Sequence, residues 1–272
     1  MSLFFRYNKP GKGVSKEDAE NRNYFVILFR KFSLIIKANL LFCGINILLL
    51  LALLFPVLPL FLNPGSHAAE QTIAYYANIL SGKQFLSPIP FVLLALFAPT
   101  FAGLTYLCRN FARQEYVFLA GDFFEQTKKN WRQSLIAGLV LSAALYFYLT
   151  AFIFYWNLNS GILRAVISVI GIFLLYLSFY VFPQIVTFKL SLIRVFQNAA
   201  IFAVANLPYN TLVFAVLAAL HGFLLLTMPV IWLILTVFFL ISFSTFTVNF
   251  VTWSIISKYM IDPNTEEKRD TD

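Results

Sequence analysis

Long apolar runs that are almost free of charged residues constrain the fold of this chain more than any other feature. A membrane-spanning helix needs about 20 consecutive apolar residues, and runs of that kind recur along most of the sequence. Strands of a membrane barrel would instead alternate apolar and polar residues over about ten positions. Only 12% of the residues are charged, whereas an average soluble domain has about 25%. The sequence therefore predicts an all-α, polytopic integral membrane protein.

Six of these runs are long enough to be spanning helices, and Pro229 separates the last two. They cover residues 38–62, 85–107, 134–155, 162–187, 212–228 and 231–257. A basic and apolar segment at residues 24–37 predicts a lead-in helix that lies on the membrane surface before the first span. We expect residues 1–23 to form a flexible cytoplasmic tail, residues 24–260 the six-helix transmembrane domain, and residues 261–272 a polar cytoplasmic tail.

The basic residues fall almost entirely on one side of this six-span topology. Of the 20 Lys and Arg residues, all except Lys83 and Arg164 lie before the first span, after the last span, or in the loops that follow spans two and four. Cytoplasmic loops carry an excess of Lys and Arg, so both termini are predicted to lie in the cytoplasm. Topology and attraction to anionic lipid account for the net charge of +8. The charge therefore does not indicate a nucleic-acid partner.

The loops that follow spans two and four each contain an amphipathic segment. We call residues 109–133 the first elbow and residues 189–206 the second elbow, and we expect each to form a cytoplasmic amphipathic helix. Asp122 is the expected N-cap in the first elbow. Such a helix either anchors the bundle at the membrane surface or offers a docking surface to a partner. The candidate partner contacts are Asp122, Phe123, Phe124, Lys128, Lys129, Trp131 and Arg132 in the first elbow, and Arg194, Phe196 and Asn198 in the second.

Polar side chains within the spans are the other candidates for function. His221 lies in the middle of span five, and span six carries a semi-polar stripe in which Ser244, Thr247 and Ser254 project near one face. These residues either hold neighbouring helices together by hydrogen bonds or line a narrow polar path. The chain carries no phosphate-binding loop, nucleophile motif or zinc-binding motif of known pattern. We therefore expect no enzymatic activity, no cofactor and no metal site.

Two stretches of the chain resemble the YesL-like family, bacterial membrane proteins defined as a domain of unknown function. The first stretch combines FAPTFAGLTYLCRNFARQEY (residues 97–116) with DFFEQTKKNWRQSL (residues 122–135), and the second is FPQIVTFKLSLIRVFQNAAIFAVANLPYNTLV (residues 182–213). The similarity covers about residues 24–260. Members of this family are often encoded beside sugar-uptake ABC transporters and glycoside-degrading enzymes. The resemblance therefore implies a role in carbohydrate import at a bacterial plasma membrane, and it carries over no catalytic or binding residue.

These observations lead to two expectations for function. The first is a non-enzymatic accessory subunit or assembly factor of a carbohydrate ABC importer, which contacts the permease subunits through helices within the bilayer and can also form a homo-oligomer. The alternative is a small channel or facilitator for a solute, with a polar path past His221, Ser244, Thr247 and Ser254.

Overall fold

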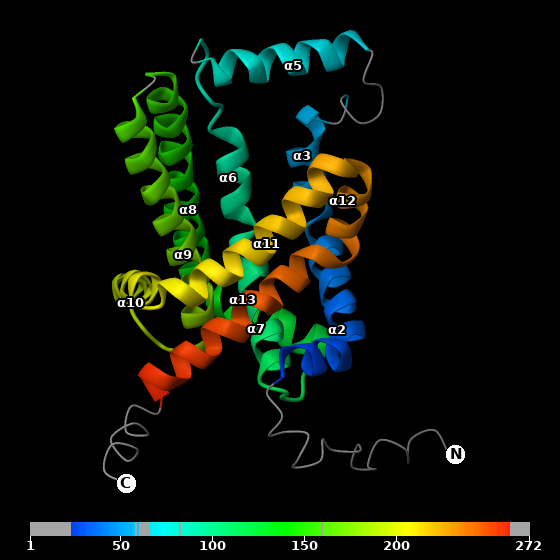
Figure 1. The fold of residues 1–272 in the computed structure, drawn as a ribbon. Coiled ribbons are helices and arrows are strands. Elements are labelled where there is room, and N and C mark those ends of the chain that lie inside the picture. The colour runs from blue at the N-terminus through cyan, green and yellow to red at the C-terminus, as the bar shows by residue number, and fades with distance from the viewer. Residues whose placement is uncertain (1–22, 58, 60–65, 82, 159, 262–272) are drawn as a thin grey trace.

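The computed structural model describes residues 23–57, 59, 66–81, 83–158 and 160–261 (Figure 1). Within these ranges the chain is all-helical and contains no strand, as the apolar pattern predicts. Apart from Asn23 and Ile261, the two predicted cytoplasmic tails lie outside the described residues.

Eleven α-helices and three shorter turns make up the described part of the chain. The helices are α2 (Tyr24–Ile45), α3 (Ile47–Leu54), α5 (His67–Leu80), α6 (Ile89–Leu96), α7 (Ala98–Ala112), α8 (Leu119–Asn157), α9 (Gly161–Thr187), α10 (Leu192–Ala205), α11 (Leu207–Thr227), α12 (Pro229–Leu235) and α13 (Ile241–Ile256). A 3-10 turn, η2 (Phe55–Val57), follows α3. Two π-helical turns, η3 (Thr236–Leu240) and η4 (Ser257–Ile261), follow α12 and α13.

Four helical segments are each long and apolar enough to cross a bilayer. They are α8, α9, α11 and the run Pro229–Ile261. The pairs α2–α3 and α6–α7 also qualify if each pair is counted as one span, although they bend by 74° and 46°. The described chain thus has four to six candidate spans, which is compatible with a multi-pass membrane protein. The predicted turn at Pro229 is confirmed, because α11 ends at Thr227 and α12 begins at Pro229.

The two bent pairs are tied together at their bends. Asn46 separates α2 from α3, and its side-chain amide donates to the Phe42 carbonyl at 2.8 Å. Pro99, which has no N–H to donate, lies at the start of α7 just after the break. The Thr100 hydroxyl next to it donates to Asn46 Oδ1 at 3.1 Å. Polar side chains therefore fix both bends relative to each other.

Two helices run through positions where the sequence predicts a break. The lead-in helix is not separate, because α2 continues past residue 37 to Ile45. The first elbow does not form its own helix either, since α8 runs for 39 residues from Leu119 to Asn157 without a break. No proline and no second glycine interrupts the chain between Gly121 and Gly138, so nothing ends the helix before the apolar run begins. The second elbow does contain a separate helix, α10.

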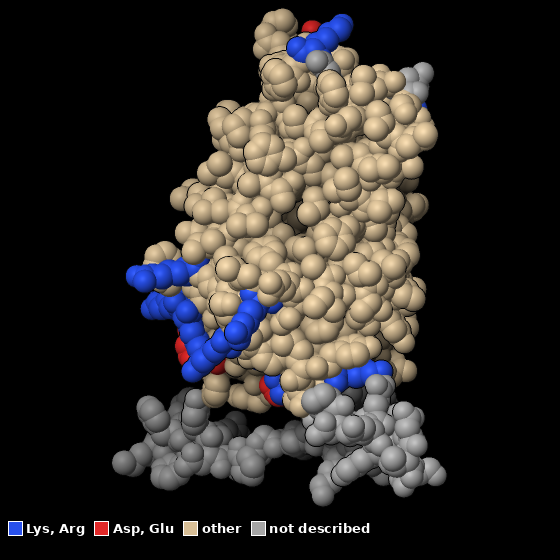
Figure 2. All heavy atoms as spheres, turned by 90° about the vertical axis from the view of Figure 1, so that its left-hand side faces the viewer, with Lys and Arg blue, Asp and Glu red and all other residues tan. Residues whose placement is uncertain are grey.

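Helices α8 and α9 form a long pair on one side of the molecule, while α11 and α13 both run diagonally across it and α5 lies across one end (Figure 1). The start of α2 and the end of η4 lie at the end opposite α5. On the face with α8 and α9, Lys and Arg gather near that same end, with a wide uncharged band between them and a small charged group at the α5 end (Figure 2). An uncharged band of this kind is what a bilayer-spanning protein presents to the lipid tails.

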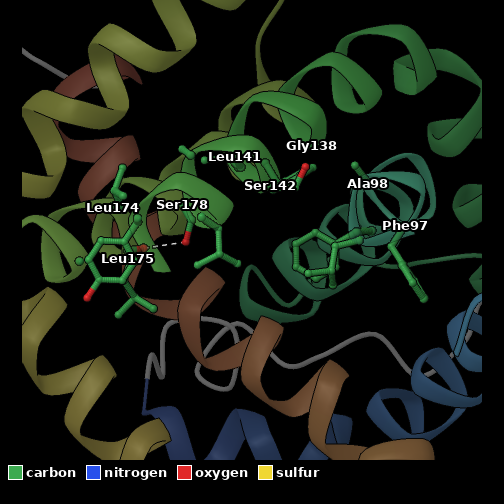
Figure 3. Close-up of a pocket in the computed structure, with 15 residues that line it drawn as sticks. Phe97, Ala98, Gly138, Leu141, Ser142, Leu174, Leu175 and Ser178 are labelled. Atoms are coloured by element: carbon green, nitrogen blue, oxygen red, sulfur yellow. Dashed lines mark hydrogen bonds between the residues drawn. The ribbon is translucent and has the colours of Figure 1, made fainter. Parts of the chain in front are cut away.

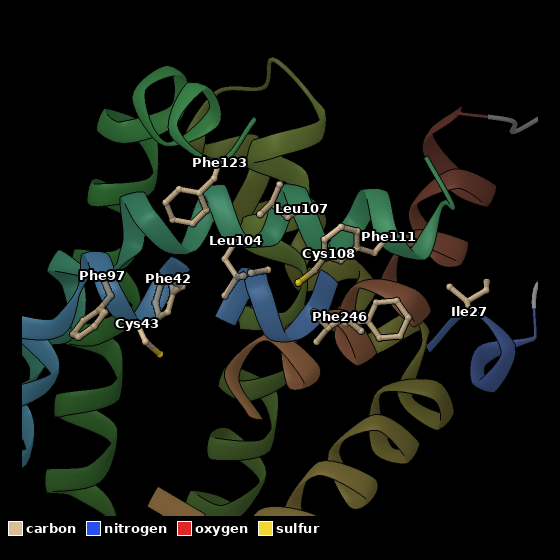
Figure 4. Packing of buried hydrophobic residues seen from close by; sticks show 12 residues of the cluster. Ile27, Phe42, Cys43, Phe97, Leu104, Leu107, Cys108, Phe111, Phe123 and Phe246 are labelled. Carbon is tan, nitrogen blue, oxygen red and sulfur yellow. The ribbon is translucent and has the colours of Figure 1, made fainter. Parts of the chain in front are cut away.

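The main core lies where α2, α7, α13 and the start of α8 meet (Figure 4). Leu104, Cys108 and Phe111 from α7 pack there with Phe123 from α8 and Phe246 from α13, all fully buried. Gly103 allows this contact, because a Cβ at that position would lie 2.8 Å from the Phe123 carbonyl oxygen. Small residues at such crossings let membrane helices approach closely.

Candidate functional site

A cavity of about 380 Å³ lies inside the bundle, between α7, α9, α11 and α13. We call it the polar cavity, because hydroxyl, amide and imidazole groups line part of it. These polar residues are Thr105, Ser178, His221, Ser244, Thr245 and Asn249. No Asp, Glu, Lys or Arg is among the lining residues, so the cavity can bind a ligand by hydrogen bonds but offers it no charge.

His221 joins three helices at the wall of the polar cavity. The Trp232 indole on α12 donates to His221 Nδ1 at 3.1 Å, and His221 Nε2 lies 2.9 Å from Ser244 Oγ on α13. An indole nitrogen can only donate, so Nδ1 is an acceptor and the imidazole is neutral. The ring proton is therefore on Nε2 and is donated to Ser244. The sequence is consistent with two roles for His221, a hydrogen-bonding link between helices or a residue of a polar path. The two hydrogen bonds show that it links the helices.

Two polar atoms in the polar cavity have unused hydrogen-bonding capacity. Thr105 Oγ1 and Asn249 Oδ1 are buried and have no hydrogen-bond partner among the described residues, and each residue is 1% exposed. The Asn249 amide nitrogen is satisfied, because it donates to the Thr245 carbonyl at 2.8 Å. An unpaired polar group in an apolar interior costs free energy. These two atoms are therefore the candidate hydrogen-bonding positions among the residues that line this cavity.

The four residues of the predicted polar path do not lie together. Thr247 is buried on another side of α13, where its hydroxyl oxygen is 2.8 Å from the Tyr24 hydroxyl on α2. Ser254 is exposed, and its hydroxyl donates to the carbonyl of Val251 in its own helix. Only His221 and Ser244 are brought into contact.

The polar face that α13 buries belongs to the semi-polar stripe of span six, but it is not the face of Ser244, Thr247 and Ser254 that the sequence predicts to be functional. It consists of Ser242, Thr245, Asn249 and Thr252, which are each at most 7% exposed. Their spacings of three, four and three residues are those of one helix face. This spacing is the sequence feature that could have identified the buried polar face, which lies on a different side of the helix from Ser254.

A second cavity, of about 440 Å³, lies beside the first between the α6–α7 pair, α8 and α9 (Figure 3). We call it the apolar cavity, since its walls are mainly aliphatic and aromatic side chains together with Gly138 and Gly171. Phe101, Ser178 and Phe182 line both cavities. The rings of Phe101 and Phe182 meet edge to face, with centroids 5.0 Å apart, and so form the wall between the two cavities.

The predicted contacts of the first elbow divide between core and surface. Phe123 is fully buried in the main core, so it is not available to a partner. Asp122 is not the N-cap, because the helix begins one turn earlier and the Asp122 carboxylate accepts a hydrogen bond from the Phe118 N–H at 3.0 Å. Phe124 and Trp131 are 44% and 47% exposed.

The exposed aromatic residues of α8 lie among basic side chains. Lys128, Lys129 and Arg132 are all exposed, and the Arg132 guanidinium carbon lies 5.3 Å from the centre of the Trp131 ring. A cation over an indole ring is favourable and holds both side chains at the surface. This part of α8 therefore presents an aromatic and cationic surface, which we call the α8 surface: Phe124, Lys128, Lys129, Trp131 and Arg132.

The segment that leads into α10 is hydrogen-bonded to α8. The Gln133 side-chain amide on α8 donates to the Leu190 carbonyl, just before α10, at 2.8 Å. Arg194 is exposed, whereas Phe196 and Asn198 are half-buried. The buried face of α10 consists of Val195, Ala199, Phe202 and Ala203. The amphipathic pattern of the second elbow predicts that Ile193 lies on the apolar face with Leu192, Phe196, Ala199 and Ala203. This is wrong for Ile193, which is 72% exposed.

Arg109 connects the end of α7 to the end of α9 and is only 6% exposed. Its guanidinium donates to the Val186 carbonyl at 3.0 Å and to the Thr187 hydroxyl at 2.9 Å. It also donates twice to Asn110 Oδ1. The C-terminal carbonyls of a helix attract a positive charge, so Arg109 stabilises the packing of α7 against α9. The sequence places it in a loop, where this role is not visible.

Among the described residues, no group of three or more His, Cys, Asp or Glu side chains could hold a metal ion. Cys43 and Cys108 are free and buried in the core.

Comparison with known proteins gives no relative for this chain: no family model, no curated protein and no solved structure matches it. The resemblance to the YesL-like family therefore stays a prediction.

Proposed function

We propose that this chain is a non-enzymatic subunit of a bacterial plasma membrane that binds the permease of a carbohydrate ABC importer, as an accessory subunit or an assembly factor. The observation that carries this proposal is the α8 surface, where Phe124 and Trp131 are exposed among three basic residues. The link to carbohydrate import rests on the YesL-like resemblance alone. Helix–helix contacts within the bilayer complete the interface, and a homo-oligomer is compatible with it.

The composition of the α8 surface supports a protein partner. Trp and Arg are the residues that most often dominate the binding energy of protein interfaces, and Trp131 and Arg132 are stacked here. The exposed Arg194 on neighbouring α10 extends the same basic region. Basic residues also attract anionic lipid, so this end of the protein lies at the inner leaflet in our proposal.

The experiment is a mild-detergent pull-down of the tagged full chain from its native host. We expect the permease and ATPase subunits of a sugar importer to co-purify, and Trp131→Ala and Phe124→Ala to reduce their recovery. Phe154→Ala is the matched control, because Phe154 is 60% exposed near the other end of the same helix. Recovery of no transporter subunit would rule out the accessory role.

The proposed topology has six spans, with each bent pair counted as one span and both termini in the cytoplasm. The asymmetric distribution of Lys and Arg supports it. Single cysteines at Lys129 and Lys83 test it, since both native cysteines are buried. A membrane-impermeant maleimide applied to intact cells should label Lys83→Cys but not Lys129→Cys. Labelling of Lys129→Cys but not of Lys83→Cys would show that the topology is the inverse of the proposed one.

A channel or facilitator is the second candidate, and the polar cavity with His221 and Ser244 in its wall favours it. Solute flux into liposomes that contain only this protein would support this candidate. If the His221→Phe variant no longer conducts the solute, the solute passes through the polar cavity.

A further inference from the structure

The polar and apolar cavities share one wall and together offer two kinds of surface to a single guest. The apolar cavity has a volume of about 440 Å³, and the polar cavity about 380 Å³. Each lies within the range of roughly 300–1,000 Å³ that small-molecule sites occupy. Phe101, Phe182 and Ser178 lie between them. The Phe101 and Phe182 rings are in contact, so an occupant of both cavities must separate these two rings.

We propose that the two cavities form one binding site for an uncharged, single-chain amphiphile, with its hydrocarbon chain in the apolar cavity and its hydroxyl-bearing head in the polar cavity. This inference goes beyond the proposed partner binding and does not depend on it. It rests on the adjacency of the cavities and on the unpaired atoms of Thr105 and Asn249.

The polar cavity determines the chemistry of the head. Asn249 Oδ1 can only accept a hydrogen bond, so the head must carry a hydroxyl or an amide N–H. The Thr105 hydroxyl can accept or donate a hydrogen bond, so it can bind a second polar atom of the same head. No charged residue lines either cavity, and His221 is held neutral by Trp232. A carboxylate or phosphate head would therefore be buried without a counter-charge, which is strongly unfavourable.

The apolar cavity is reached from the side of the bundle. Leu94 on α6 and Leu145 on α8 line it and remain 41% and 39% exposed. Both lie in apolar helices, so in a bilayer their exposed surface faces lipid tails. A chain can enter from the membrane between these residues without crossing water. Gly138 and Gly171 also line the cavity, and the Ala98 and Tyr148 side chains pack closely against these two glycines.

The experiment uses the purified full chain in lipid nanodiscs and a monoacylglycerol with a diazirine in its acyl chain. We expect saturable cross-linking to peptides of α8 and α9 that unlabelled monoacylglycerol competes away. A fatty acid with the same diazirine chain but a carboxylate head should label at least about tenfold more weakly, because its charge is not compensated. Labelling that does not saturate, or equal labelling by the fatty acid, would overturn the proposal.

Matched variants locate the site. Ala144 lines the apolar cavity, while its neighbour Ala143 is exposed and does not. We expect Ala144→Phe to fill the cavity and abolish labelling, and Ala143→Phe to retain it. For the head, Asn249→Leu and Thr105→Val should each weaken binding about tenfold, the effect of one lost hydrogen bond. Thr252→Val is the control, since Thr252 is equally buried on α13 but lines neither cavity.

Each variant is compared with the wild type by gel filtration and thermal unfolding before labelling. If Ala144→Phe does not fold, the nearly isosteric Thr105→Val and the control Thr252→Val still decide the question. Unchanged binding in both Thr105→Val and Asn249→Leu would show that the polar cavity does not hold the head, and the proposal would be wrong.

Discussion

Asn39 on α2 accepts a hydrogen bond from the backbone N–H of Ser242 at 2.7 Å, in the middle of the last candidate span. The same side chain donates to the carbonyls of Val237 at 2.6 Å and Thr236 at 3.0 Å. Thr236 and Val237 are the first two residues of the π-helical turn η3, and Ser242 lies just after it, where the regular hydrogen-bond ladder is interrupted. One buried amide thus makes three hydrogen bonds to the backbone around this turn.

We therefore expect Asn39→Leu to destabilise the protein by about 2 kcal/mol, since it removes these hydrogen bonds to the backbone. The melting temperature of the purified protein in detergent should fall by roughly 4–8 °C. Asn78→Leu is the control, because Asn78 is exposed on α5. An unchanged melting temperature in Asn39→Leu would mean that the π turn does not need this side chain.

Arg109 should not tolerate replacement by lysine. A lysine ammonium keeps the charge but cannot reproduce the planar fork that reaches both the Val186 carbonyl and Asn110. We expect Arg109→Lys to lower the free energy of unfolding by about 2 kcal/mol. Arg194→Lys should change it by less than about 0.5 kcal/mol, because Arg194 is exposed. Denaturant titration of both variants measures the difference, and equal losses would contradict the buried role of Arg109.

Two glycine-to-alanine substitutions should have different effects on the free energy of unfolding. A Cβ at Gly138 would overlap the Ala98 side chain and lie 3.1 Å from the Ala95 carbonyl oxygen. Gly138→Ala should therefore destabilise the packing of α8 against α6 and α7 by about 1–3 kcal/mol. A Cβ at Gly44 meets nothing within 4 Å, so Gly44→Ala should be neutral or stabilise α2 by up to about 1 kcal/mol. Thermal unfolding distinguishes the two, and a stable Gly138→Ala protein would contradict the close crossing.

The hydrogen bond between His221 and Ser244 can be measured by a double-mutant cycle. We expect His221→Phe and Ser244→Ala to be non-additive, with a coupling of about 0.6 kcal/mol and at most about 1.7 kcal/mol, the range found between membrane helices. The free energies of unfolding of the two single variants and the double variant provide the cycle. Strict additivity would mean that the bond between α11 and α13 is absent in the folded protein.

The apolar runs predict the helices well, because spanning length and hydropathy are local properties of the sequence. They do not predict which face of each helix is buried. Lipid tails are as apolar as neighbouring helices, so on α9 Val169 can face outward and Ile167 inward at no difference in hydrophobic free energy. Hydrophobic periodicity therefore carries little information about packing in such a bundle.

Polar residues carry the information that apolar periodicity lacks. Asn39, Thr245 and Asn249 are buried because membrane helices bring hydrogen-bonding groups together. The positions of Thr105 and Asn249 in one cavity depend on how α7 crosses α13, which is a tertiary relationship. No local pattern in either helix specifies it. The first elbow illustrates the same limit, since Phe123 and Phe124 are adjacent in sequence but lie in the core and at the surface.

The hydrogen bond from Thr100 to Asn46 has a mechanical consequence. Two half-helices, α3 and α6, rise from the bends that this bond joins and extend toward the end where α5 lies (Figure 1). Because their bases are fastened to each other, the two half-helices share one pivot. A tilt of α3 is expected to be accompanied by a tilt of α6, while α2 and α7 stay fixed in the core below. The bond thus holds the bases of both half-helices at one point of the bundle.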